Sequence, residues 1–178
     1  MATQGFNSPG TATTTTWSNP NNALTVNGSS ASNTAPNTAT LRLTNYAFTV
    51  PAGVIDGIEA EVTASQNSGL PETDYNLTVS FTKDGSVGAG SSTDLGLSGL
   101  PLQTLTVGGA SSLHGTTWTV AEVNASTFGV IVAINALAGT NACIVDCVRI
   151  KIYYTATGGG SGVVFGMVRR PAINVRVN

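Results

Sequence analysis

The stretch Asn45-Tyr-Ala-Phe-Thr-Val-Pro-Ala-Gly-Val-Ile-Asp-Gly-Ile-Glu-Ala-Glu-Val62 decides the fold class of this 178-residue chain. Every second residue from Tyr46 to Val50 is large and apolar, which is typical of a strand with one buried face. Pro51-Ala-Gly53 then ends the pairing, because proline has no N–H to donate and glycine allows a tight bend. A second alternating run follows over residues 54–64. The stretch therefore predicts two strands joined by a corner.

The same alternation recurs at short intervals along the chain, and no apolar spacing of several helical turns accompanies it. It predicts strands over Thr40–Thr44, Tyr75–Thr82, Pro101–Val107, Phe128–Ile134 and Ala142–Thr155, a short strand over 23–27, a loop over 28–38 and one helical turn near residues 121–125. The apolar Phe128–Ile134 strand is expected to be central. Together these elements predict an all-β protein, a single antiparallel, jelly-roll-like β-sandwich over residues 23–157.

The two ends of the chain differ from this body in composition. Residues 1–22 are low in complexity and predict an extended N-terminal arm that is anchored by Trp17. At the other end, residues 158–162 read Gly-Gly-Gly-Ser-Gly, a flexible linker. It leads into the β-prone, basic C-terminal arm 163–178. Since an apolar segment after a flexible linker does not easily stay free in water, we expect this arm to add a strand to another surface.

Charge is sparse and unevenly placed. Charged residues make up 9% of the chain, against roughly 25% in ordinary soluble domains. All nine acidic residues lie within residues 1–150, whereas residues 151–178 hold Lys151 and three arginines and no acid. This asymmetry predicts that the tail docks on an acidic surface of a sister subunit, another protein or nucleic acid. Direct nucleic-acid contact is the least favoured of these, because only Phe165 accompanies the arginines.

The cysteines bear on the compartment in which the chain folds. In a continuous strand, Cys143 and Cys147 share one face about 13 Å apart, which is too far for a disulfide. Two free thiols, together with an N-terminus that lacks a basic or apolar leader, predict folding in a reducing cytoplasm. No apolar run has the length of a membrane span.

The residues that could carry chemistry form no recognised catalytic pattern. His114 is the one histidine; it is expected to be a solvated or capping residue in a Gly/Ser loop, without a second ligand at zinc spacing. Glu59 and Glu61 share one strand face and offer a glycosidase pair, a cation site or simply a solvated face. We predict that the protein is not an enzyme and has no catalytic residue, metal site or cofactor.

Three further positions are expected to be structural. Asp56 and Gly57 have the composition of a turn. Asp146 falls on an apolar strand face, where a buried carboxylate would need Arg42 or Arg149 as its partner.

The tryptophans leave two interpretations open. Trp17 and Trp118 are expected to lie in the core or to anchor an arm, with platforms that stack on sugars as the alternative.

Four segments taken together resemble a family of tailed-phage virion proteins. They are Thr16-Trp-Ser-Asn-Pro-Asn-Asn-Ala23, the opening stretch 45–62, the segment His114–Val130 and the segment Val145–Thr155. Members of that family are small β-sandwich components that are encoded near phage head and tail genes. The resemblance implies a non-enzymatic virion part and carries over no catalytic residues.

Within that class, the short arms favour a capsid decoration (cement) protein on the capsid exterior, made in the host cytoplasm. The expected partners are the major capsid protein and further copies of the chain itself, as a trimer or dimer. The expected partner-binding residues are Trp17, Val163, Val164, Phe165, Arg169, Arg170 and Arg176. The alternatives are a neck or tail component that joins successive rings, and a carbohydrate- or receptor-binding module that uses exposed aromatic side chains.

Overall fold

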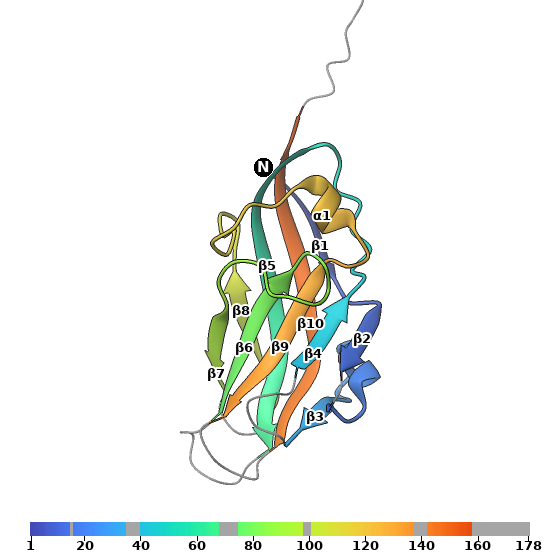
Figure 1. Ribbon diagram of the computed structural model, residues 1–178, viewed down its shortest axis with the longest axis vertical. Helices are drawn as coiled ribbons and strands as arrows, with labels where there is room; N and C mark the ends of the chain where they lie inside the picture. The colour runs from blue at the N-terminus through green and yellow to red at the C-terminus, as the bar shows by residue number, and fades with distance from the viewer. Residues whose placement is uncertain (15, 35–39, 68–74, 98–100, 137–141, 158–178) are drawn as a thin grey trace, which may run out of the picture.

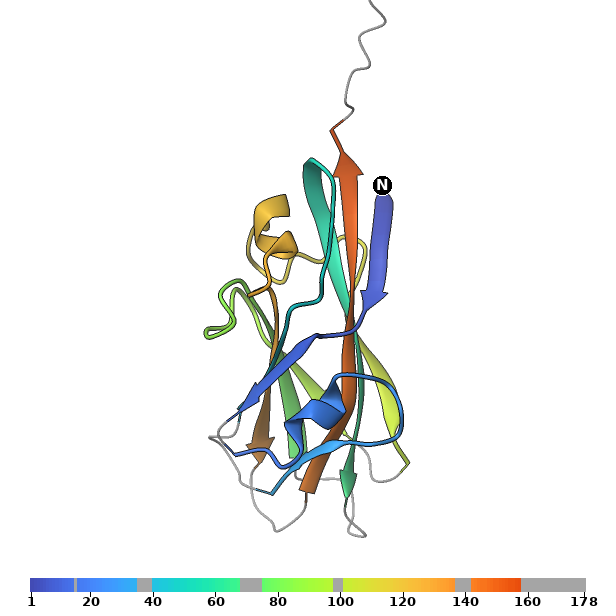
Figure 2. The same cartoon turned by 90° about the vertical axis from the view of Figure 1, so that its right-hand side faces the viewer.

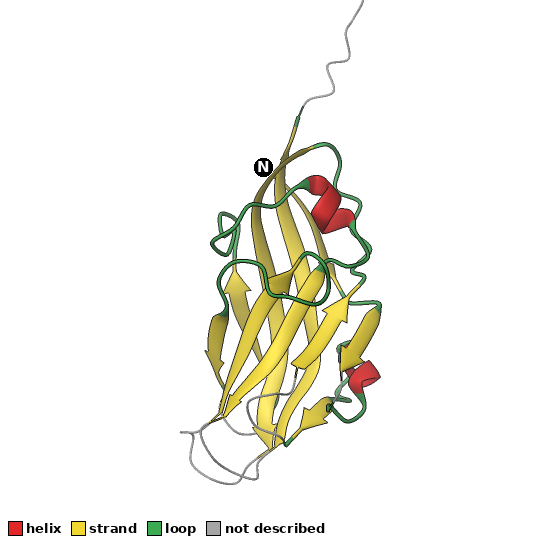
Figure 3. Ribbon diagram, in the orientation of Figure 1, coloured by secondary structure: helices red, strands yellow, loops and turns green. Residues whose placement is uncertain are grey.

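The computed structural model describes residues 1–14, 16–34, 40–67, 75–97, 101–136 and 142–157 (Figure 1). Its regular secondary structure is nearly all strand, with one short helix and one 3-10 turn (Figure 3). In chain order the elements are β1 (Ala2–Asn7), β2 (Thr11–Thr14), η1 (Pro20–Ala23), β3 (Ala31–Asn33), β4 (Thr40–Thr44), β5 (Gly53–Asn67), β6 (Tyr75–Thr82), β7 (Thr93–Gly96), β8 (Gln103–Gly108), α1 (Val120–Asn124), β9 (Gly129–Ala136) and β10 (Ala142–Ala156).

Two antiparallel sheets pack face to face, as the side view in Figure 2 shows. The first sheet, sheet A, has the order β1-β10-β5-β8, and β3 also pairs with β10. The second sheet, sheet B, has the order β2-β4-β9-β6-β7. From β4 onward the chain crosses between the sheets at every step except β6 to β7, and β1 lies beside the last strand. This succession is a jelly roll, so the predicted fold class is confirmed.

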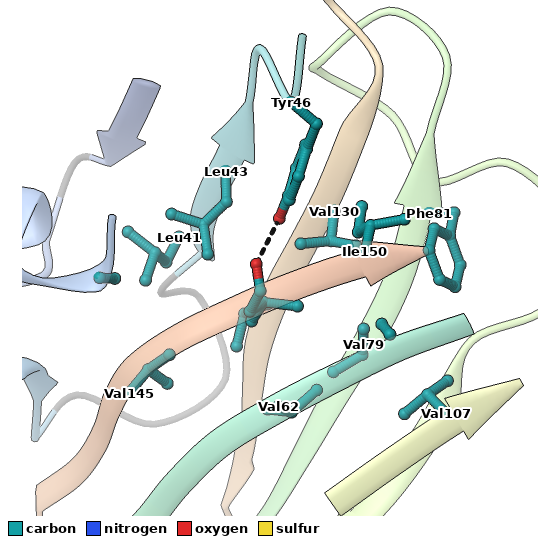
Figure 4. Close-up of a cluster of buried hydrophobic side chains, with 14 of the residues drawn as sticks. Leu41, Leu43, Tyr46, Val62, Val79, Phe81, Val107, Val130, Val145 and Ile150 are labelled. Carbon is teal, nitrogen blue, oxygen red and sulfur yellow. Dashed lines mark hydrogen bonds between the residues drawn. The ribbon is translucent and has the colours of Figure 1, made fainter. Parts of the chain in front are cut away.

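Tyr46, Phe48 and Val50 are buried as their alternation predicted, but residues 45–50 form no strand in the structure. Asn45 and Ala47 adopt positive φ angles of 61° and 53°, which break a regular strand. Side chains replace the missing ladder: the amide of Asn124 accepts from the backbone N–H of Val50 at 2.8 Å and donates to its carbonyl at 2.9 Å. The hydroxyl of Tyr46 donates to the buried carbonyl of Val148 at 2.9 Å (Figure 4). The segment is therefore a corner that is held by side chains.

The predicted turn at Asp56 and Gly57 was wrong, because both residues lie inside the long strand β5. A register shift against β10 falls at this point, where Tyr153 lies opposite Gly57 and the next residue lies opposite Ile55. Asp56 is the extra residue of a β-bulge, and its carboxylate accepts from the hydroxyl of Thr155 at 2.7 Å. The turn-like composition therefore marks a bulge in a strand.

A second bulge changes which residues of β10 face the core. Val145 lies opposite Ala64 and Cys147 lies opposite Thr63, so Asp146 has no cross-strand partner. Val145 and Val148 consequently both reach the core, whereas Cys147 lies on the other face of the sheet. The prediction that both cysteines share a face was wrong for this reason.

The N-terminal segment is part of the body in the described residues, which corrects the expectation of a separate arm over residues 1–22. β1 pairs with β10 in sheet A, and β2 pairs with β4 in sheet B. Residues 23–27 form no strand, and the predicted loop 28–38 contains β3, which pairs with β10. Local composition missed these edge strands, because their partners lie far along the chain.

The core lies between the sheets and is mainly aliphatic (Figure 4). It includes Leu41, Leu43, Val62, Val79, Val107, Val130, Val145 and Ile150. An aromatic cluster covers one end of it: Phe128 meets the rings of Tyr46, Phe48 and Trp118 at centroid distances of 6.4, 6.0 and 5.5 Å. β9 is central in sheet B, as its apolar sequence predicted. Among the described residues, no helix is long and apolar enough to cross a membrane.

Candidate functional site

Charged and aromatic side chains gather on the outer face of sheet A, where β1, β10 and β5 lie side by side. This group, the β5–β10 strip, consists of Phe6, Glu59, Glu61, Arg149, Lys151 and Tyr153. The strand register places Glu61 opposite Arg149 and Glu59 opposite Lys151. The strip is the most charged surface of the sandwich that the strand pairing brings together, so it is the candidate contact site of the body.

The strip is internally paired. Arg149 forms an ion pair with Glu61 at 2.5 Å, and the hydroxyl of Tyr153 donates to Glu59 at 2.6 Å. The ammonium group of Lys151 lies 5.2 Å from the ring centroid of Phe6 and 4.7 Å from that of Tyr153. The hydrogen bond with Tyr153 raises the pKa of Lys151 further above its ordinary value.

This geometry suits a polar contact with another macromolecule. Glu59 and Glu61 do share one face, as predicted, but each carboxylate is held by a neighbouring side chain. The faces of the rings of Phe6 and Tyr153 lie near the Lys151 ammonium, which competes with stacking on a sugar. The alternation of residues 149, 151 and 153 signalled part of the strip in the sequence, whereas nothing signalled Phe6.

His114 is buried, which contradicts the expectation of a solvated loop residue. Its Nε2 lies 3.0 Å from the carbonyl oxygen of Ile58. Since a carbonyl can only accept, Nε2 carries the proton. The imidazole also packs on Phe81 with a centroid distance of 4.2 Å. Burial lowers the pKa of His114 below its ordinary value of 6.5, so the histidine is a neutral packing residue.

The burial of His114 predicts a pH dependence of stability. Above about pH 6.5 the imidazole is neutral in the folded and unfolded chains. As the pH falls below that value, the unfolded chain binds the proton first, so the free energy of unfolding should fall between about pH 6.5 and pH 5. Urea denaturation at several pH values measures this. His114→Asn, which tolerates the positive φ, should flatten the profile over this range; an equal slope in both proteins would contradict the prediction.

Asp146 is buried, but its partners are not the arginines proposed from the sequence. One carboxylate oxygen accepts from the backbone N–H groups of Asn27 and Gly28 at 3.3 and 3.1 Å. Arg149 pairs instead with Glu61. The bulged carboxylate thus fastens the loop before β3 onto β10, which is a structural role.

Both thiols are free, as predicted, and both are buried. Burial raises the pKa of Cys143 to about 12 and that of Cys147 to about 11. Both therefore stay protonated near neutral pH, which makes them poor nucleophiles and metal ligands. Within the part of the chain that the structure describes, no three His, Cys, Asp or Glu side chains are grouped so as to hold a metal ion.

The tryptophans are core residues. Trp17 is 5% exposed and Trp118 is 6% exposed, and the Trp118 indole N–H donates to the carbonyl of Leu113 at 3.0 Å. Their interpretation as sugar platforms was therefore wrong, and burial speaks against a partner contact through Trp17. The other predicted contacts, Val163, Val164, Phe165, Arg169, Arg170 and Arg176, lie outside the described residues.

Comparisons with known proteins give little further information. No protein family and no curated protein sequence matches the chain. It is similar to the CBM22-1 and GH10 modules of the N-terminal endo-1,4-β-D-xylanase 10B of Clostridium thermocellum, solved in complex with xylohexaose, with 11% identity and a TM-score of 0.36. The match covers 88% of this chain and 26% of that one, so the chain spans about a quarter of its length. A likeness this weak carries no argument about function.

Proposed function

We propose that the protein is a non-enzymatic structural component of a tailed-phage virion, a decoration protein that binds and stabilises the shell of major capsid protein. The body supplies a rigid scaffold, and the C-terminal arm supplies the main contact. The observation that carries the proposal is where the segments that resemble virion proteins lie in the fold.

Three of the four segments meet in one packing unit. Tyr46 and Phe48 come from the second segment, and Trp118 and Phe128 from the third; their rings form the aromatic cluster of the core. The fourth segment supplies the Val148 carbonyl that Tyr46 binds. Residues that a family shares for packing define a scaffold, so the resemblance supports a common body whose function lies on its surface.

The surface is consistent with this role. The outward positions of sheet B are mostly small and neutral, as in the row Thr40, Ala133 and Thr78 across β4, β9 and β6, although the adjoining row includes Arg42 and Ile131. Such a face can approach another protein closely at little desolvation cost. The strip on sheet A adds paired charges that can set the orientation of a partner.

The decisive experiment locates the chain in purified virions by cryo-EM. A copy number that matches the shell symmetry supports the proposal, whereas copies confined to the neck or tail rings would identify the alternative component.

Reversing the charge of the arm in the double variant Arg169→Glu/Arg170→Glu should weaken its rebinding to particles that lack the protein, and the particles should be less stable to heat. Unchanged rebinding would contradict the role of the arm, and Val87→Ala on the exposed surface of the body is the matched control.

A further inference from the structure

Strand β8 forms one edge of sheet A. It pairs with β5 over Glu59 to Ala64, and no other strand of the described residues pairs with it. An edge strand presents backbone N–H and C=O groups that can pair with another chain. The position of β8 at the side of the sandwich is visible in Figure 1.

The direction of these backbone groups follows from β5. The carbonyl of Ile58 accepts from Gly109, and its N–H donates to Ser112, so Ile58 points its backbone groups toward the β8 side. Because this direction alternates along a strand, Ala60 and Val62 also point toward β8. Their partners on β8 are Val107 and Leu105.

The intervening residues of β8, Thr104 and Thr106, therefore turn their N–H and C=O groups away from β5. Both threonines are exposed. The backbone groups of Leu105 and Val107 face β5, their partner strand in the sheet. The free edge thus consists of two threonines that flank the half-buried Leu105.

The other sheet edges carry features that hinder pairing. β7 and β2 are only four residues long, and β7 carries the charged Asp94. β1 has a register irregularity between Gln4 and Asn7, and β3 has three residues. β8 has six residues, Gln-Thr-Leu-Thr-Val-Gly, without charge, proline or bulge. It is the edge with the least protection.

We propose that β8 is a docking edge for β8 of a second copy of this chain, paired antiparallel about a two-fold axis at Leu105. In this register Thr104 of one copy lies opposite Thr106 of the other, and each such pair exchanges both of its N–H···O bonds. The two Leu105 side chains meet across the axis. No other antiparallel register places Thr104 of one copy opposite Thr106 of the other. The proposal rests on the proposed function, because a capsid shell would bring copies of the chain close together.

Charge and area define the strength of this contact. The edge carries no charge, and the nearest acids, Glu59 and Glu61, are already bound by Tyr153 and Arg149, so like charges do not oppose the pairing. A single strand pair covers less than the roughly 1,200 Å² of a standard interface. The pairing is therefore weak in dilute solution, and it becomes effective where a lattice raises the local concentration.

Cysteine cross-linking tests the pairing and its register. In the proposed register, Cα atoms of Thr104 and of the opposing Thr106 are about 5.5 Å apart, within the range for a disulfide. The variants Thr104→Cys and Thr106→Cys, each made in the full chain, are mixed at high concentration and mildly oxidised. A disulfide-linked mixed dimer should form, and intact-mass spectrometry detects it. Either variant alone should form little dimer, and the native thiols should not cross-link because they are buried. The matched control is Thr11→Cys mixed with Thr13→Cys on β2, which should stay monomeric.

Three outcomes would overturn the proposal: no mixed dimer, equal dimer in a single variant, or equal dimer in the β2 control. A second test adds Thr106→Lys to the Thr104→Cys chain. This double variant should form no mixed dimer with Thr106→Cys chains, whereas Thr13→Lys added to the Thr104→Cys chain should leave the mixed dimer unchanged. These measurements need no capsid. A chain found on the shell without cross-linking overturns only the β8 pairing, and cross-linking by a chain absent from virions overturns only the proposed function.

Discussion

Phe128→Ala should lower the free energy of unfolding by about 3–5 kcal/mol, the usual cost of emptying a large buried aromatic site. Phe128 is 0% exposed and contacts three other rings of the core. The three rings come from two separate loops, the corner between β4 and β5 and the segment before α1, so they cannot all move to fill the space. Urea denaturation followed by tryptophan fluorescence measures the loss, since Trp118 is one of the neighbours.

The matched control for this prediction is Val87→Ala. Val87 is 67% exposed, so its truncation should change stability by no more than about 0.5 kcal/mol. A loss below about 1 kcal/mol for Phe128→Ala would mean that the aromatic cluster does not hold the sheets together. It would also remove the main support for treating the shared segments as packing residues.

Gly57→Ala should be strongly destabilising, with a loss of about 2–3 kcal/mol. A Cβ at this position would collide with the carbonyl oxygen of Gly109 and with the backbone of Ala110. Both obstacles are main chain, so a side-chain rotation does not relieve the clash. The loop after β8 would have to move away from β5, and His114, which binds the adjacent Ile58 carbonyl, would lose its position.

Gly96→Ala is the control for Gly57→Ala, because a Cβ on Gly96 meets no atom within 4 Å. We expect it to be nearly neutral or slightly stabilising, since alanine restricts the unfolded chain more than glycine does. Thermal melts of the two variants side by side measure the difference. Equal stability would show that the loop after β8 can shift freely, contrary to the packing described above.

The long strands were predictable because their signal is local. Tyr75–Thr82 was predicted with the bounds that the structure has, and Ala142–Ala156 differs from its prediction by one residue. Leu77, Val79 and Phe81 of the first strand are buried, and so are Val148, Ile150 and Ile152 of the second, so the apolar period of two is visible in the sequence itself. The helical turn α1 was also predicted, and a capping box between Thr119 and Glu122 begins it.

The candidate site was predictable only in part. The shared face of Glu59 and Glu61 followed from strand alternation, and so did the face of Arg149 and Lys151. The register of β5 against β10 places these two faces side by side and pairs their charges. No local sequence pattern specifies this register. Phe6 joins them only because the first strand of the fold pairs with the last.

The sequence by itself determined that the chain is an all-β sandwich, because alternation and strand-ending residues act over a few positions. Only the tertiary structure decided what the opening stretch 45–62 does: its first half is a corner bound by Asn124 and Val148, and its second half contains a bulge. Tertiary packing likewise placed residues 2–14 in the sheets and His114 in the core. The physical reason is that burial and pairing at these positions come from residues about 30 to 150 positions away, and such contacts leave no periodic trace in a local window.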